Sequence, residues 1–168
     1  MGLFSRNKKP KQEVKENPYP GLRTMAFSVS SEDLGLNLDE TNSSLYGVIM
    51  DWDMGNGIVT LVAYKSGDTS LYISSGAGFI GAGRHQDVNQ LVKSFVAESE
   101  SLIENAQPDS SNELPVDGGI VFHFLTKNGK YAIKDNINSM ENKTSPNLGF
   151  FEAANQVISA IRIASERK

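Results

Sequence analysis

Residues 45–75, LYGVIMDWDMGNGIVTLVAYKSGDTSLYISS, decide the fold. The first run alternates apolar and other residues, which predicts a strand with Tyr46, Val48, Met50 and Trp52 on one face. The runs IVTLVAY and TSLYISS are rich in β-branched and apolar residues, as strands are. DMGNG and KSGD supply turn residues between the runs. Because such short turns join antiparallel neighbours, the stretch predicts a three-stranded meander.

Residues 85–106 predict an amphipathic helix, because apolar residues recur at steps of three and four. The stripe consists of Val88, Leu91, Val92, Phe95, Val96, Leu102 and Ile103. Burying these side chains contributes roughly 10–20 kcal/mol, and ordering the segment costs at least as much. The helix therefore needs an apolar partner surface, and the meander provides one.

The rest of the chain predicts a second hairpin and a second helix. Asn128-Gly129 lies between the strand-like runs GIVFHFLT and YAIKD and is a strong hairpin signal. The last helix begins near Asn147 and carries an apolar face of Phe151, Ala154, Val157, Ile158 and Ile161. The order β-β-β-α-β-β-α predicts an α+β two-layer sandwich of about five antiparallel strands and two amphipathic helices. SVSSEDLGL adds a short N-terminal helix, capped by Ser30 or Ser31, while LRTMAF before it fits either a helical turn or an edge strand.

Length and charge predict one domain, residues 21–168, preceded by a disordered basic tail, residues 1–20. Residues 1–16 carry five basic and two acidic side chains, a net charge of +3, and the remainder carries eleven basic and eighteen acidic, a net charge of −7. The acidic body disfavours nucleic-acid binding. We expect no integral membrane segment, and at most weak membrane contact by the tail, in which Arg6 occupies the position where a myristoylation pattern requires Ser or Thr. The absence of cysteine and of a visible export signal fits a cytoplasmic protein.

The glycine-rich stretch SSGAGFIGAGRH, residues 74–85, contains the G-x-G-x-x-G spacing of dinucleotide-binding proteins. That motif requires a parallel βαβ unit and an acidic residue about 20 positions later, and both are missing here. The favoured interpretation is a bend that lets strand and helix pack closely, with Phe79 and Ile80 filling the core. The alternative is a small-anion or nucleotide site at the start of the helix, formed by Gly76, Gly78, Gly81, Gly83, Arg84 and His85.

Other candidate chemistry is sparse. Asp51 and Asp53 could share a cation, but the EF-hand spacing fails and a solvated strand end is favoured. His123 is expected to be half-buried, hydrogen-bonded and structural. A Ser–His–Asp set drawn from Ser74 or Ser75, His85 and Asp51 lacks a G-x-S-x-G context. Two histidines without cysteine make a zinc site improbable, so we expect no catalytic residues, metal or cofactor.

The sequence therefore predicts a non-catalytic binding module: an adaptor, an immunity-type protein, a small chaperone or a homodimer. It would contact a protein partner through an exposed strand edge or through its acidic face. The alternative is a small-anion or nucleotide binder that uses the glycine-rich stretch. A hydrolase built on Asp51, Asp53 and His85 ranks last, because no spacing in the chain specifies a reaction.

Overall fold

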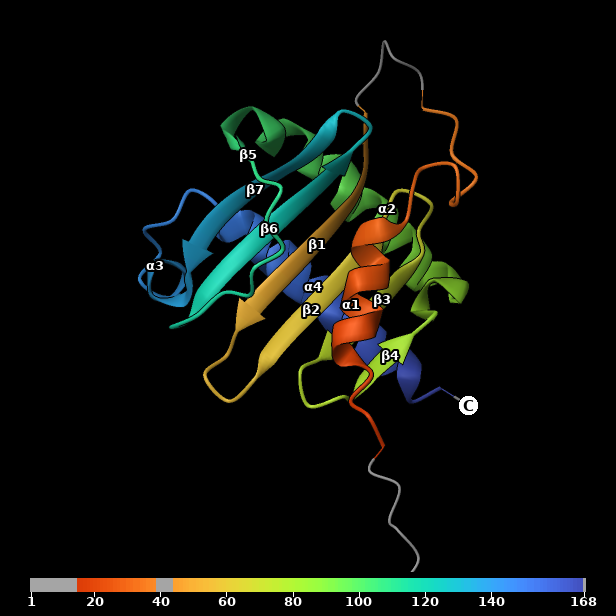
Figure 1. Cartoon of the computed structure of the whole chain (residues 1–168), viewed down its shortest axis with the longest axis horizontal. Coiled ribbons are helices and arrows are strands. Elements are labelled where there is room, and N and C mark those ends of the chain that lie inside the picture. Colours follow the sequence, from red (N-terminus) through yellow and green to blue (C-terminus); the bar gives the residue numbers. More distant parts are fainter. Residues whose placement is uncertain (1–14, 39–43, 168) are drawn as a thin grey trace, which may run out of the picture.

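The computed structural model describes residues 15–38 and 44–167, and in this part of the chain seven strands form one antiparallel sheet (Figure 1). Most of the expected tail lies outside the described residues. The strand order is β4-β3-β2-β1-β6-β7-β5. The strands are β1 (Leu45–Asp53), β2 (Ile58–Tyr64), β3 (Thr69–Ile73), β4 (Gly78–Ile80), β5 (Gln107–Pro108), β6 (Gly119–Thr126) and β7 (Gly129–Asn136).

Helices cover both faces of this sheet. Two long helices, α2 (Gln86–Ser99) and α4 (Leu148–Ser165), lie behind it in Figure 1, and α1 (Tyr19–Ser28) crosses in front. The short helix α3 (Ile137–Glu141) follows β7, and 3₁₀ turns at Ala82–Arg84 and Glu100–Asn105 flank α2. The predicted α+β class and the order β-β-β-α-β-β-α are confirmed. The structure adds the short strands β4 and β5, and α1 on the second face.

The main core lies between the sheet and the two long helices. It contains the predicted stripe residues Val88, Val92, Phe95 and Val96 of α2, together with the buried face of α4. A smaller apolar cluster lies between α1 and the opposite face of the sheet. The periodicities of 2 for strands and 3.6 for helices therefore located most of the core correctly.

One side chain of β1 lies on the face opposite to the predicted one. Val48 and Met50 face the long helices, as expected, but Tyr46 packs against the cluster under α1. The pairing of β1 with β6 shifts in register between Leu45 and Gly47, which is a β-bulge. A bulge inserts one extra residue and reverses the alternation beyond it, so the prediction for Tyr46 was wrong.

The N-terminal helix lies earlier in the chain than expected. It spans Tyr19–Ser28 and so includes LRTMAF, while residues 31–35 of SVSSEDLGL form turns. Ser30 and Asp33 exchange the reciprocal hydrogen bonds of a helix start, at 2.9 and 3.1 Å. Gly35, at φ +69°, ends this segment before a further turn forms.

Candidate functional site

The four candidate glycines of residues 74–85 serve turns and close packing. Gly76 and Gly81 have φ values of +101° and +76°, which disfavour any other residue. A Cβ at Gly78 would lie 2.5 Å from the carbonyl oxygen of Leu71, and one at Gly83 would lie 2.3 Å from that of Gly67. These backbone angles and contacts give each glycine a structural reason that is independent of any ligand. Phe79 packs against the core as predicted, but the prediction for Ile80 was wrong, because its side chain is 63% exposed.

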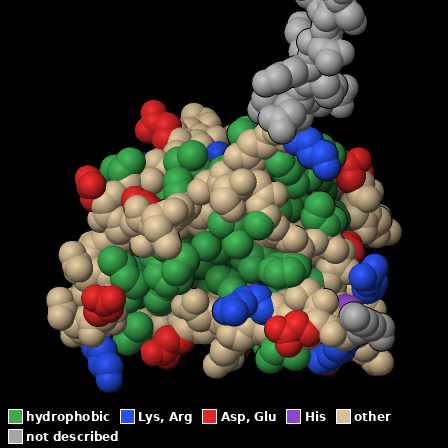
Figure 2. Space-filling view, turned by 90° about the horizontal axis from the view of Figure 1, so that it is seen from below, with side chains coloured by type: hydrophobic (Ala, Val, Ile, Leu, Met, Phe, Trp, Pro, Cys, Tyr) green, Lys and Arg blue, Asp and Glu red, His purple; other side chains and the backbone are tan. Residues whose placement is uncertain are grey.

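Arg84 and His85, with Gly78, nevertheless border a pocket of about 280 Å³ that we call the β4 pocket. The chain brings them together with the last turns of α4. The lining residues are Gly78, Phe79, Ile80, Ala82, Arg84, His85, Ile161, Ala164, Ser165 and Arg167. Gly76, Gly81 and Gly83 are not part of this lining. Seen from below, the molecule presents a broad hydrophobic surface across the middle of this face (Figure 2).

The charges at this pocket are only partly matched. Arg167 forms a two-point ion pair with Asp87 in the first turn of α2, at 2.7 and 3.1 Å. The guanidinium group of Arg84, which is exposed, makes no hydrogen bond or ion pair with any residue that the structure describes. The β4 pocket therefore has an apolar wall and one uncompensated cation.

A buried charged cluster lies on the other face of the sheet, under α1. Asp51 is 0% exposed, and Arg23 of α1 donates to both its oxygens, from Nε at 3.1 Å and from Nη2 at 2.7 Å. Thr60 Oγ1 lies 2.6 Å and His123 Nε2 3.1 Å from the same carboxylate. The interpretation of Asp51 as part of a solvated strand end was wrong, because the side chain points inward and is fully enclosed.

The proton positions in this cluster follow from its geometry. An ionised carboxylate only accepts hydrogen bonds, so Thr60 and His123 both donate to Asp51. The hydroxyl of Tyr19, 2.8 Å from Thr60 Oγ1, must then donate to Thr60. Burial by itself raises the pKa of Asp51, but hydrogen bonds from His123 and Arg23 and the guanidinium charge outweigh it and lower this pKa to about 2.

His123 is neutral in this arrangement. Burial lowers its pKa, and this effect exceeds the opposing influence of the Asp51 carboxylate. The physical reason is that Arg23 already balances Asp51, so a second cation would add net charge to the interior. His123 is more buried than expected, at 1% exposure, and its Nδ1 has no hydrogen-bond partner within the described residues.

We expect acid to destabilise the protein through these two groups. Both have pKa values below their ordinary ones in the folded state, so the unfolded chain binds more protons and stability falls as pH falls. The loss from His123 begins below about pH 6.5, and Asp51 contributes about 2 kcal/mol, lost between about pH 5 and pH 2. Urea unfolding across this range measures the effect.

The matched variants separate this cluster from surface carboxylates. The double variant Arg23→Met, Asp51→Leu removes the contribution of Asp51 and should flatten the stability profile between about pH 5 and pH 2, while the loss from His123 below about pH 6.5 remains. Asp87→Asn, which removes an exposed ion-paired carboxylate, should leave the contribution of the cluster in place. An unchanged acid profile in the double variant would contradict the assignment.

The predicted Ser–His–Asp set is not assembled. The Asp51 carboxylate is bound by His123 on the α1 face of the sheet, whereas His85 precedes α2 on the opposite face. The hydroxyl of Ser74 accepts a hydrogen bond from the backbone N–H of Ile58. Asp53 accepts one from the backbone N–H of Gly55 and does not share a site with Asp51. In the described part of the chain, no three acidic, His or Cys side chains are grouped so as to hold a metal ion.

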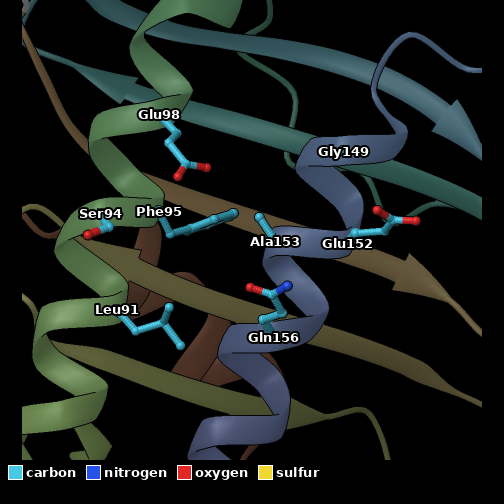
Figure 3. A pocket seen from close by; sticks show the side chains of 8 residues that line it. All are labelled: Leu91, Ser94, Phe95, Glu98, Gly149, Glu152, Ala153 and Gln156. Carbon is cyan, nitrogen blue, oxygen red and sulfur yellow. The ribbon is translucent and has the colours of Figure 1, made fainter.

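A groove runs between α2 and α4 on the outer face of the helical layer (Figure 3). Phe95 of α2 extends toward Ala153 of α4, Leu91 also points toward α4, and the carboxylate of Glu98 lies beside α2 at the edge of the gap. The groove has a volume of about 240 Å³ and is lined by Leu91, Ser94, Phe95, Glu98, Gly149, Glu152, Ala153 and Gln156. Small residues at 149 and 153, one helical turn apart, leave this space open: a Cβ at Gly149 would meet no atom within 4 Å.

The charge at this groove is acidic and unpaired. Glu98 and Glu152 are both exposed, and neither forms an ion pair with a described residue. Elsewhere on α2, Asp87 is matched by Arg167. Apolar floor and acidic rim together define a surface for a ligand that is apolar at one point and cationic beside it.

Comparison with protein-family models, with curated proteins and with solved structures found no match to this chain. No helix in the described part is both long enough and apolar enough to cross a membrane.

Proposed function

We propose that this protein is a non-catalytic binding module that docks an amphipathic, basic helix of a partner protein in the groove between α2 and α4. The observation that carries the proposal is the open gap above Gly149, floored by Phe95 and bordered by Glu98, which forms no ion pair with a described residue. A third helix can place an apolar side chain in such a gap by the packing of ridges into grooves. The proposal keeps the cytoplasmic location expected from the sequence.

Three features support this choice over the alternatives. The charged side chains of the groove, Glu98 and Glu152, are both acidic, which matches a basic partner and not a phosphate group. The buried groups Asp51 and His123 are engaged with each other and with α1, which leaves them no access to a substrate. The outer strands β4 and β5 have only three and two residues, so they offer little to a partner that adds a strand.

The test uses a fluorescent synthetic amphipathic helix of leucine and lysine, with a leucine and glutamate helix as its charge-reversed control. Anisotropy should show saturable binding of the lysine helix only. Gly149→Met fills the gap without backbone strain, and Glu98→Lys reverses the rim charge; each should weaken binding about tenfold, equivalent to about 1.4 kcal/mol. Glu113→Lys makes the same charge change at an exposed loop position and should have little effect.

Binding that survives both groove variants would place the docking surface elsewhere. A lysine helix that does not bind at all would remove the proposal. Circular dichroism of each variant should show an intact fold, because Gly149 and Glu98 are exposed and the Glu98 carboxylate makes no hydrogen bond with a described residue.

A further inference from the structure

A second apolar surface lies at the end of the sheet where β1 turns into β2. The register places Trp52 beside Val59 and Val59 beside Ile73, in one row across β1, β2 and β3. All three side chains are only partly buried. Trp52 and Val59 pack against the main core, so this row faces the long helices. We call it the Trp52 row.

Helix α4 forms the other side of this surface. Phe151 meets Trp52 edge to face, with 5.1 Å between the ring centres, and Ile158 is partly exposed two turns later. Ile161 then lines the β4 pocket. From Phe151 to Ile161 the helix advances about 15 Å. Figure 2 views this end of the sheet, and hydrophobic side chains gather across the middle of the face that it shows.

The two ends of the surface differ in chemistry. At one end lies Trp52; at the other lies the β4 pocket, where Arg84 has no partner among the described residues. The neighbouring cation Arg167 is matched by Asp87. The occupant therefore needs a long apolar body and one anionic group at its end.

An acyl chain meets this requirement better than a peptide does. The strand backbones beneath the row are already paired in the sheet, and the side chains above them are hydrocarbon except for the indole N–H of Trp52, which is buried and has no hydrogen-bond partner among the described residues. A peptide would bring amide groups that find no partner there, which is unfavourable, whereas an acyl chain carries none. An ionised carboxylate at Arg84 forms charge-assisted hydrogen bonds.

We propose that this surface binds a long-chain fatty acid, with its carboxylate at Arg84 and its acyl chain along α4 toward Trp52. The site shares no residue with the groove between α2 and α4. Fatty-acid binding can therefore be tested independently of the proposed docking of a partner helix.

Trp52 is the only tryptophan of the chain, which gives a direct readout. Dodecanoate, added below its micelle concentration, should change the Trp52 emission in a saturable way. Each methylene removed should weaken binding about fourfold, so each step from dodecanoate to decanoate and from decanoate to octanoate, which removes two methylenes, should weaken binding about sixteenfold. Methyl dodecanoate lacks the charge and should bind at least tenfold more weakly than dodecanoate.

Two variants test the carboxylate anchor and the path of the acyl chain along α4. Arg84→Gln should weaken dodecanoate at least tenfold but leave methyl dodecanoate unchanged, and Ile158→Glu should weaken both. Lys93→Gln, an equal charge change at an exposed position of α2, is the control and should behave as the native protein. No change in Trp52 emission with dodecanoate, or equal dodecanoate affinity in Arg84→Gln, would overturn the proposal.

Discussion

Replacing Arg23 with methionine is expected to destabilise the protein by about 3–5 kcal/mol. The variant keeps most of the hydrocarbon of the side chain but leaves the Asp51 carboxylate at 0% exposure without its counter-charge. Arg23 also donates from Nη1 to the backbone oxygen of Asn112 at 2.8 Å, so the loop between β5 and β6 loses an anchor. Urea unfolding followed by circular dichroism measures the change.

The double variant Arg23→Met, Asp51→Leu distinguishes an unpaired charge from lost packing. Because a buried ion pair gains little over an apolar pair of similar size, the double variant should recover part of the stability lost in the single one; the recovery is incomplete because Thr60 and His123 lose their acceptor. Hydrogen exchange should show α1 opening more readily in Arg23→Met than the long helices do. A loss below about 1 kcal/mol in the single variant would mean that water reaches Asp51.

Replacing Phe150 with alanine is expected to cost about 3–5 kcal/mol. Phe150 is 8% exposed and stacks on Phe95, with 4.7 Å between ring centres and an angle of 5° between the rings. Its ring centre also lies 5.0 Å from the ring centre of Phe122. The variant leaves a cavity under the sheet, and it removes the support beneath Phe95, the floor of the groove between α2 and α4. Thermal and urea unfolding measure the loss of stability.

Ile163→Ala is the matched control for this prediction. It shortens a side chain on the same helix that is 58% exposed, and it should change stability by less than about 0.5 kcal/mol. Phe150→Leu keeps more of the volume and should fall between the two. Equal effects of Phe150→Ala and Ile163→Ala would contradict the assignment of Phe150 to the core.

The sequence predicted the sheet and the two long helices because their signals are local and repeated. Helix α1 was harder to place. Its buried residues, Tyr19, Arg23 and Ala26, follow helical spacing, but the central one is charged and hides the apolar pattern. β4 and β5 are too short to show any periodicity. These elements exist because tertiary contacts hold them, which single-sequence patterns do not record.

The candidate sites show the same limit. The sequence does not distinguish a glycine that a ligand approaches from a glycine that a neighbouring carbonyl group approaches. The role of Gly83 therefore became clear only from its close approach to the carbonyl oxygen of Gly67. Asp51 follows Ile49 on the buried face of a strand, which was a usable signal. Its partners Arg23 and His123 lie 28 positions before it and 72 after it, and no local pattern links them.

The lengths of the outermost strands have a consequence for self-association. β4 and β5 have only three and two residues, and the stretch of β7 that β5 leaves uncovered, residues 133–136, is also short, so these edges are poor templates for the main-chain ladder on which fibrils and domain-swapped oligomers grow. The protein is thus expected to resist aggregation at high concentration. Any assembly that it forms should depend on contacts between surface side chains and should dissociate when those side chains are substituted.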